Sequence, residues 1–466
     1  MEAVKTVRSR PKRRLGLTPF DRLVWLVLAA LWLATGLLIV RGDQVGVQVK
    51  AVSPADGATN VSSLAPIRAA FDQPIELSGV LRSIIVEPPV SGTAQWEGET
   101  LVFYPSEPLL PDTLYTVTIP AGLRGQGGQM VQQPVVWQFR TGHPRVLYLA
   151  EDRQGYYQIV LVDPFDVAAG PRQLTAEPFG LWDYMPAPDG STIAYAAIRA
   201  DGGSDLWAIA PDGGNRRLLL ACPEAACSGP AWHPDGQRLI YERRGAGELA
   251  VGQGLSRLWW LDLASGDTAA VFDDNQWLGF AAAISPDGQW LAHVAPHKLA
   301  LYVYNLRDGR SLEIPTQMGE PGVWNPRGDL LLYTDIVTMG NGFPTHVFRV
   351  NVESGNALDI SGEDTLGDSA PAWSPDGREI VLSRRTPGSP VAGQVWLMPA
   401  SGGDGRFLPG GTGQHQTALS WSPDGRMLLS QRIPLAGLDQ PAIWLHDLLT
   451  DEEREVGLGA WPRWLP

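Results

Sequence analysis

The chain has 466 residues and a net charge of -14, and it is 44% hydrophobic but only 18% charged. This composition is too apolar for a disordered chain, and 52 glycines and 39 prolines spread along it indicate a turn-dense all-β protein. The length predicts two or three domains. An acidic body argues against nucleic acid as the partner.

The N-terminal residues predict a membrane anchor. Residues 1–22 carry seven basic and two acidic side chains, and Leu23 to Val40 contain no charge. Eighteen such residues are about the minimum for a transmembrane helix, so we expect a basic cytoplasmic segment at 1–22 and a single-pass anchor at 23–40. The rest would then be extracytoplasmic. Signal-peptide cleavage at Ala34-Thr35-Gly36 is the alternative, but it would leave apolar Leu37–Val40 on the mature end, so an uncleaved anchor is favoured.

Residues 46–142 predict a first β domain. Short alternating runs such as "SIIVEP", "TLVFYP" and "VVWQFRT" are separated by turn clusters, as in a β-sandwich. "LLPDTLYTV", ending at Val117, predicts a tyrosine corner in which Tyr115 bonds nearby backbone. Pro54–Val61, Pro111–Tyr115 and Trp137–Gly142 resemble, in order, three motifs of bacterial Ig-like domains of the S-layer type. The resemblance implies a spacer or adhesion module.

The remainder, 144–466, is a repeat. "PAWHPDGQRLIYE" from Pro230 recurs as "PAWSPDGREIVLS" from Pro371 and in four looser copies, with turn prolines at 188, 234, 286, 326, 375 and 423. In Pro-Asp-Gly, proline fixes φ and glycine supplies a positive φ, which predicts a hairpin. A second strand motif, such as "RLWWLDLASG" from Arg257, follows each copy. Four strands in 40 to 50 residues indicate a propeller blade.

These motifs resemble the TolB-type propeller family, which implies a β-propeller over residues 144–466. Arg327 departs from the family pattern because it replaces the aspartate of the Pro326 turn. The unit from Val146 lacks a first strand, whereas the tail "PRWLP" matches "PAWHP" and "PAWSP". We therefore expect the C-terminal strand to complete that unit and close a seven-bladed ring, with six blades as the alternative.

The two cysteines, Cys222 and Cys227, lie in "CPEAAC". Outside the cytoplasm so close a pair favours a disulfide over free thiols. A metal site is not expected there, because no histidine accompanies the pair. The spacing of His293 and His297 suits a metal only on a helix, and Pro296 breaks that pattern. No metal or cofactor is therefore expected.

Few residues of the sequence support a catalytic function. The nucleophile elbow Gly-x-Ser-x-Gly of propeller-capped serine peptidases is not in the sequence, and "GDSAP" from Gly367 has proline where glycine is required. A pair of catalytic carboxylates stays open, because spacing in sequence cannot place two carboxylates at catalytic separation. We expect a non-enzymatic protein.

Two candidate binding surfaces follow from propeller connectivity. Basic residues recur after the second strand of most units and predict a basic face for an anionic partner, at Arg153, Arg199, Arg243, Arg244, Lys298, Arg384, Arg385 and Arg432. The alternative, that each pairs with a neighbour such as Glu151, Asp152, Asp205 or Glu242, is favoured. Residues between units should line the channel mouth, at Asp183, Ser228, Glu320, Ser369 and Thr417. The family resemblance implies protein or peptide contacts at this mouth.

The sequence therefore predicts a membrane-anchored, extracytoplasmic binding or scaffold protein of the cell envelope. Its propeller would recognise a protein, a peptide or an envelope polymer. The alternative is an enzyme, a hydrolase or lyase acting on glycan or peptide, with its site at the channel mouth.

Overall fold

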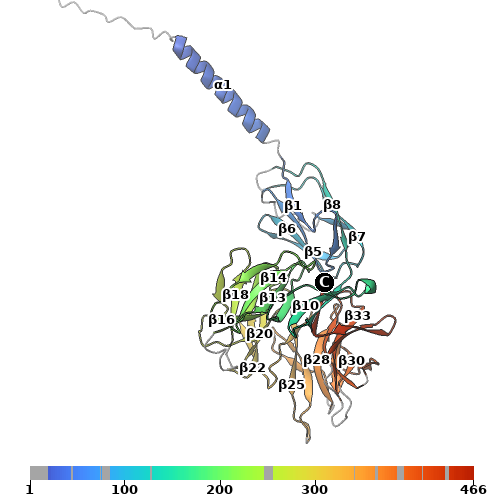
Figure 1. Cartoon of the computed structure of the whole chain (residues 1–466). Coiled ribbons are helices and arrows are strands. Elements are labelled where there is room, and N and C mark those ends of the chain that lie inside the picture. Colours follow the sequence, from blue (N-terminus) through green and yellow to red (C-terminus); the bar gives the residue numbers. More distant parts are fainter. Residues whose placement is uncertain are drawn as a thin grey trace, which may run out of the picture.

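A computed structural model describes residues 19–42, 46–73, 75, 84–125, 129–245, 256–340, 342–362, 366–385, 393–411, 413–435 and 440–466. Helix α1, Pro19–Gly42, precedes the β domains and leads away from them (Figure 1). Among the described residues, no helix combines the length and apolarity needed to cross a membrane, so the structure does not support the predicted transmembrane helix. Most of the predicted basic segment, residues 1–18, lies outside the described part of the chain.

The first β domain is a sandwich of two four-stranded sheets. One sheet has the order β1-β3-β6-β5 and the other β2-β8-β7-β4. Ile67, Phe71 and Phe139 are fully buried between the sheets, because alternate residues of each strand face inward. Leu110 N donates to the Tyr115 hydroxyl at 2.9 Å, which confirms the predicted tyrosine corner. The strands are β1 Val49–Ser53, β2 Ala58–Val61, β3 Ile67–Phe71, β4 Ile85–Glu87, β5 Gly92–Glu97, β6 Thr100–Pro105, β7 Leu114–Ile119 and β8 Val135–Thr141.

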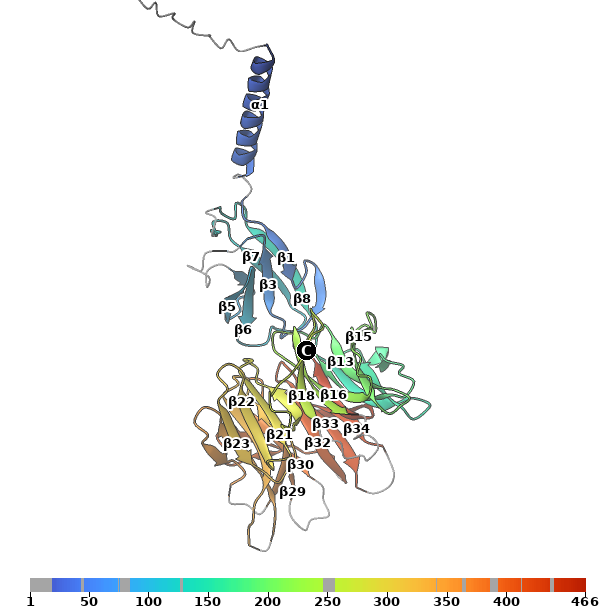
Figure 2. The same cartoon turned by 90° about the vertical axis from the view of Figure 1, so that its left-hand side faces the viewer.

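The second β domain consists of antiparallel units of four strands arranged around a common axis (Figure 2). Each unit is named here by its innermost strand. The β36 unit consists of β36 Ala460–Leu465, β9 Arg145–Glu151, β10 Tyr157–Val162 and β11 Arg172–Gln173. The β12 unit consists of β12 Leu181–Pro186, β13 Ile193–Ile198, β14 Ser204–Ile209 and β15 Arg217–Leu220. The β16 unit consists of β16 Ala225–Trp232, β17 Arg238–Gly245, β18 Arg257–Asp262 and β19 Thr268–Ala270. A 3-10 helix, η2, spans Val167–Ala169.

The following units repeat this order. They are the β20 unit, with β20 Phe280–Ile284, β21 Trp290–Ala295, β22 Ala300–Asn305 and β23 Ser311–Pro315; the β24 unit, with β24 Val323–Trp324, β25 Leu330–Ile336, β26 Thr345–Asn351 and β27 Ala357–Asp359; the β28 unit, with β28 Gly367–Trp373, β29 Glu379–Arg385, β30 Gln394–Pro399 and β31 Arg406–Phe407; and the β32 unit, with β32 Gln414–Trp421, β33 Met427–Pro434, β34 Ala442–Asp447 and β35 Glu452–Leu458. The β12 and β16 units are joined into one sheet through parallel pairing of Ser204 with Ala226.

The repeated Pro-Asp-Gly segments form the predicted hairpin turns. In each, the glycine has a positive φ and its N–H donates to the carbonyl of the residue before proline, as at Gly377, with a φ of 71° and a 2.9 Å bond to Ser374. A side chain other than glycine would be strained there. The Pro326 turn keeps this geometry although Arg327 replaces aspartate, since Gly328 bonds Asn325 at 3.1 Å.

The repeated tryptophan connects consecutive units. Its indole N–H donates to a carbonyl of the innermost strand of the preceding unit, from Trp232 to Met185 at 3.0 Å and from Trp373 to Val323 at 3.1 Å. Trp324, Trp421 and Trp464 make the same contact with Ala283, Ala372 and Ser420. The motif residue is therefore explained by packing between units.

The C-terminal strand pairs with the start of the domain. β36 is antiparallel to β9, with Trp464 opposite Val146 and Leu465 opposite Arg145, as the tail motif predicts. Leu465 is fully buried, and Trp464 reaches Ser420 of the preceding unit at 3.4 Å. The edge of β9 is thereby covered.

The Ig-like sandwich lies against one face of the second domain, beside the C-terminus (Figure 1). On that face a side chain at Gly190, in the first Pro-Asp-Gly turn, would meet both Pro466 and Ser62 of the sandwich. The opposite face, named the far face here, carries the turns after each unit's second strand and the connections between units. It is turned away from the sandwich.

Candidate functional site

The far-face ends of the innermost strands, called the mouth here, are irregular. The pairing shifts register in β12, β16, β20, β28, β32 and β36. Gly229, Ala281, Ala370, Ala418 and Trp461 have φ between 49° and 59° at these points. Such bulges break the strand alternation and re-aim a side chain, here at the mouth.

The residues predicted from sequence for this mouth lie near these bulges. Asp183, Ser228, Ser369 and Thr417 are in the innermost strands and are partly exposed. Glu320 is exposed and precedes β24. The assignment of these side chains to binding stays a prediction.

Two carboxylates and one amide at the mouth bond the next unit. Asp183 Oδ2 accepts the Gly229 N–H at 2.7 Å, Glu242 Oε1 accepts that of Ala281 at 2.8 Å, and Gln431 Oε1 accepts that of Trp461 at 2.8 Å. Burial raises the pKa of Asp183 to about 6, and Asp183 Oδ1 is buried without a hydrogen-bond partner among the described residues. Burial also raises the pKa of Glu242. Both carboxyls flank Gly229, where a Cβ atom would lie 2.6 Å from Glu242 Oε1.

Exposed aromatic side chains lie on the same face, over the junction of the β36 and β12 units. Trp461 is 53% exposed, Trp182 52% and Phe179 40%. Tyr157 contacts Trp461 edge-on at 5.6 Å between ring centroids, and the Tyr184 hydroxyl donates to the Trp461 carbonyl at 2.8 Å. We call Trp182, Trp461, Phe179, Tyr156 and Tyr157 the aromatic rim. The rim was not predicted from the sequence, although Trp461 occupies the repeat position that is glycine or alanine in four other units.

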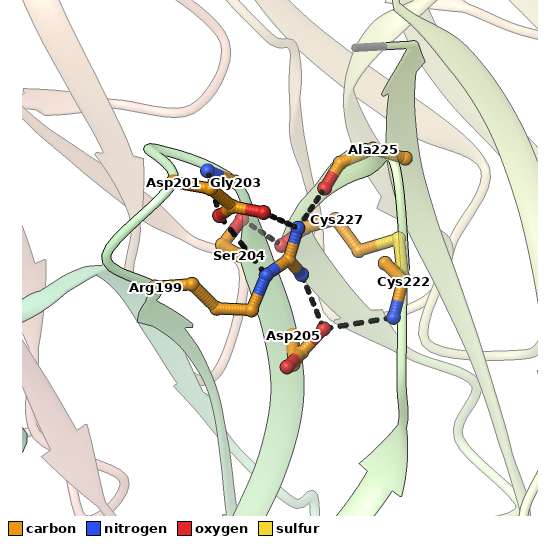
Figure 3. Close-up of polar contacts among 8 residues, drawn as sticks. All are labelled: Arg199, Asp201, Gly203, Ser204, Asp205, Cys222, Ala225 and Cys227. Carbon is orange, nitrogen blue, oxygen red and sulfur yellow. Dashed lines mark hydrogen bonds and ion pairs between the residues drawn. A yellow bond between two sulfur atoms is a disulfide. The ribbon is translucent and has the colours of Figure 1, made fainter.

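Arg199 of the predicted basic face is partly buried, and neighbouring groups occupy its guanidinium (Figure 3). Its guanidinium bonds Asp201, Asp205 at 2.5 Å and the carbonyl of Ala225 at 2.9 Å. Asp205 Oδ1 also accepts the N–H of Cys222, which forms a disulfide with Cys227. The arginine therefore fixes the disulfide loop between the β12 and β16 units, and its pairing with Asp205 is the alternative that the sequence favoured.

Arg384 and Arg432 are buried, with side chains 8% and 3% exposed. Arg384 makes two 2.7 Å bonds to Asp368, which is fully buried, and stacks over Trp396. Arg432 pairs with Glu453 and stacks over Trp444. A buried arginine whose donors are used by a carboxylate is not available to a partner.

The other predicted basic residues differ in environment. Arg243 stacks over the Trp259 ring, and Lys298 pairs with Glu313 at 3.6 Å. Arg244 is partly buried, whereas Arg385 and Arg153 are exposed. The far face is therefore not a uniform cationic surface.

No group of three or more histidine, cysteine, aspartate or glutamate side chains in the described residues could hold a metal ion. His293 is fully buried, accepts the Trp277 indole N–H at 3.4 Å and lies 3.1 Å from the Val294 carbonyl. Burial lowers its pKa to about 4. His293 is thus a neutral core residue, and exposed His297 contacts only the Trp277 ring among the described contacts.

Comparison with known proteins agrees with both domains. Residues 43–141 match the family model of a bacterial Ig-like domain, and residues 212–434 match that of the TolB β-propeller domain. No curated protein matches the chain.

Solved structures are similar to the chain at low identity. TolB from Acinetobacter baumannii is 15% identical, with 82% of this chain and 83% of that chain covered and a TM-score of 0.42. An oligogalacturonate lyase in complex with manganese is 17% identical, with 65% and 85% covered and a TM-score of 0.49. The β-propeller domain of the trilobed protease from Pyrococcus furiosus is 11% identical, with 75% and 96% covered and a TM-score of 0.46. The chain thus combines an N-terminal bacterial Ig-like domain with a TolB-type β-propeller domain.

Proposed function

We propose that this is a non-enzymatic binding or scaffold protein whose propeller recognises a protein or peptide on its far face. The aromatic rim carries the proposal. Three large aromatic side chains, Phe179, Trp182 and Trp461, remain 40 to 53% exposed at the junction of the β12 and β36 units, on the face that the Ig-like domain leaves open. Tryptophan and tyrosine dominate the binding energy of protein interfaces because they bury large area at little entropic cost.

The architecture supports a scaffold role. We propose a ring of seven blades closed by β36, with six as the alternative, and the grouping of the strands into four-stranded units supports this count. The Ig-like sandwich contacts the opposite face near Gly190 and would act as a spacer. The rim would thereby face away from the N-terminal helix.

Photo-crosslinking tests the proposal. In one variant of the full chain a benzophenone amino acid replaces Trp182. In a control variant it replaces Leu449, which is 79% exposed in the turn after β34 on the opposite face. We expect a partner to be crosslinked from position 182 and not from position 449. This crosslink should be lost when Trp461→Ala is added to the position-182 variant. Equal crosslinking from both positions, or capture of a glycan alone, would contradict it.

We further propose that the two β domains lie outside the cytoplasm, with the N-terminus inside. The disulfide between Cys222 and Cys227 supports this compartment, as do the seven basic residues before Leu23. Protease added to intact cells should degrade the body of the chain, and extraction at alkaline pH should show whether α1 retains it in the membrane. Protection of the whole chain in intact cells would refute this location.

A second candidate function is an enzyme at the channel mouth, acting on glycan or peptide as a hydrolase or lyase. Asp183 and Glu242 favour it, since both carboxyls flank Gly229 and both have pKa values raised by burial, as catalytic acids often do. The hydrogen bonds of Asp183 and Glu242 to the bulge N–H groups offer a purely structural explanation for the presence of these two carboxyls. Turnover of envelope glycan or peptide that Asp183→Asn abolishes, with binding retained, would establish the enzyme.

A further inference from the structure

A cleft of about 490 Å³ opens beside the aromatic rim. Its walls are the turn after β9 and the connection from β11 to β12, and it is lined by Asp152, Arg153, Gln154, Gln173, Ala176, Glu177 and Pro178. Because β11 is the outermost strand of its unit, this cleft lies at the periphery of the ring and not in the channel. Its volume lies in the usual range of ligand pockets.

The cleft is held in shape by side chains that are already satisfied. Gln158, which is buried, donates to Asp152 Oδ2 at 3.1 Å and to the Glu177 carbonyl at 2.9 Å, and so connects the two walls. Asp152 Oδ1 accepts the N–H groups of Gln154 and Tyr156. A site held by such hydrogen bonds needs little reorganisation to bind.

The second acidic residue of the cleft is also engaged. The Glu177 carboxylate accepts the Tyr195 hydroxyl at 2.8 Å and pairs with Arg216 through two bonds of 2.9 and 3.0 Å. Neither carboxylate in the cleft is therefore available as the main contact for a ligand.

Arg153 is the exception in this cleft. It is exposed, and among the described residues it forms no ion pair, unlike Arg199, Arg384 and Arg432. Its guanidinium is a planar fork of donors that matches a carboxylate. Exposed Pro178 and Phe179 form the edge of the cleft, where Phe179 contacts Tyr156 edge-on at 6.4 Å. A cation next to apolar rings suits a carboxylate with an apolar neighbour.

We propose that the Arg153 cleft binds a carboxylate of a partner polypeptide, with an adjoining apolar side chain packed on Pro178 and Phe179. This inference rests on the proposed function, since it names the chemistry of the bound segment. The carboxylate is a chain terminus or an acidic side chain. Polypeptide fits better than an acidic glycan, because tryptophan, tyrosine and arginine are the residue types that dominate protein interfaces.

Three fluorescein-labelled probes test the proposal on the full chain by anisotropy. They are Gly-Pro-Leu-Phe with a free carboxylate, the same peptide as its amide, and Gly-Glu-Leu-Phe amide. We expect the first probe to bind if the site takes a chain terminus, and the third to bind if it takes an acidic side chain. The second probe, which has neither carboxylate, should bind at least tenfold more weakly. Arg153→Gln should weaken the bound probe at least tenfold.

Arg378→Gln is the matched control, because Arg378 is 85% exposed in a Pro-Asp-Gly turn on the opposite face. It should leave binding unchanged. Equal binding of the amide, no effect of Arg153→Gln, or tighter binding of digalacturonate than of any peptide would overturn the proposal. Probe binding without crosslinks from position 182 would support carboxylate binding in the Arg153 cleft and refute partner recognition by the aromatic rim. Crosslinks from position 182 without probe binding would support recognition by the rim and refute carboxylate binding in the cleft.

Discussion

Single side chains at the ends of the innermost strands decide how one unit meets the next. Asp183, Glu242 and Gln431 accept a bulge N–H from the following unit, and five tryptophans donate to the preceding one. The tryptophans are visible in the sequence because they recur at one spacing. The acceptors are not, because aspartate, glutamate and glutamine come from two different strands.

Asp183 predicts an unusual dependence of stability on pH. Its folded pKa of about 6 exceeds the unfolded value of 3.8, so the folded state holds the proton more tightly. Stability from this group is therefore present below pH 3.8 and is lost as the pH rises through 6. Asp183→Asn keeps an acceptor for Gly229 and removes the charge. We expect it to stabilise the protein at pH 8 by up to about 3 kcal/mol and not at pH 3.5.

Chemical denaturation at several pH values measures this effect. Glu320→Gln, which removes an exposed carboxylate from the same face, is the control and should not change the pH profile. A parallel profile for Asp183→Asn and the unmodified chain would show that the Asp183 carboxyl is not perturbed.

Trp373 tests the contact between units. Trp373→Phe keeps most of the buried ring but removes the indole donor and leaves the Val323 carbonyl without it. We expect a loss of about 1 to 3 kcal/mol in the free energy of unfolding. Trp182→Phe, at an exposed ring, should cost much less. Equal losses in denaturant titrations would mean that the bond between units adds nothing.

At the scale of elements, the local patterns predicted the hairpins and the sandwich well. Pro-Asp-Gly fixes its turn through φ preferences alone, and Tyr115 bonds backbone only five residues away. The fate of the arginines was harder to predict. Arg384 pairs with Asp368 on the adjacent strand. Arg432 pairs with Glu453, and these two residues lie on the second and fourth strands of one unit. Both pairings depend on the register between strands, which spacing in the sequence alone does not show.

The disulfide loop is the element that most depends on covalent chemistry. Cys222 and Cys227 close a short loop that Arg199 and Ser204 hold through the Ala225 and Cys227 carbonyls. Replacing both cysteines by serine should cost about 2 kcal/mol by the loop-entropy relation. Thermal unfolding with and without reductant measures it: the reductant should lower the midpoint of the unmodified chain and leave the variant unchanged. A reductant effect on the variant would place the sensitivity elsewhere.

At the scale of the whole molecule, the sequence predicted two β domains in the correct order because each carries its own repeated or separated motifs. The aromatic rim could not be predicted in this way. It forms where the chain's end meets its beginning, because the pairing of β36 with β9 brings Trp461 to Tyr157 and Tyr184. The proposed binding surface is thus a consequence of the closure itself.

Closure also predicts the effect of removing the tail. Deleting Ala460–Pro466 removes β36, exposes the edge of β9, and takes away buried Trp464 and Leu465. Because the neighbouring units pack against this strand, we expect the propeller to unfold at a much lower temperature while the Ig-like domain, with its own core, keeps its transition. Calorimetry separates the two transitions. Arg463→Ala, at an exposed side chain of the same strand, is the control and should shift neither transition by more than a few degrees. If the truncated chain melts like the full one, β36 does not close the ring, and the rim of Trp461 and Trp182 is not a single surface.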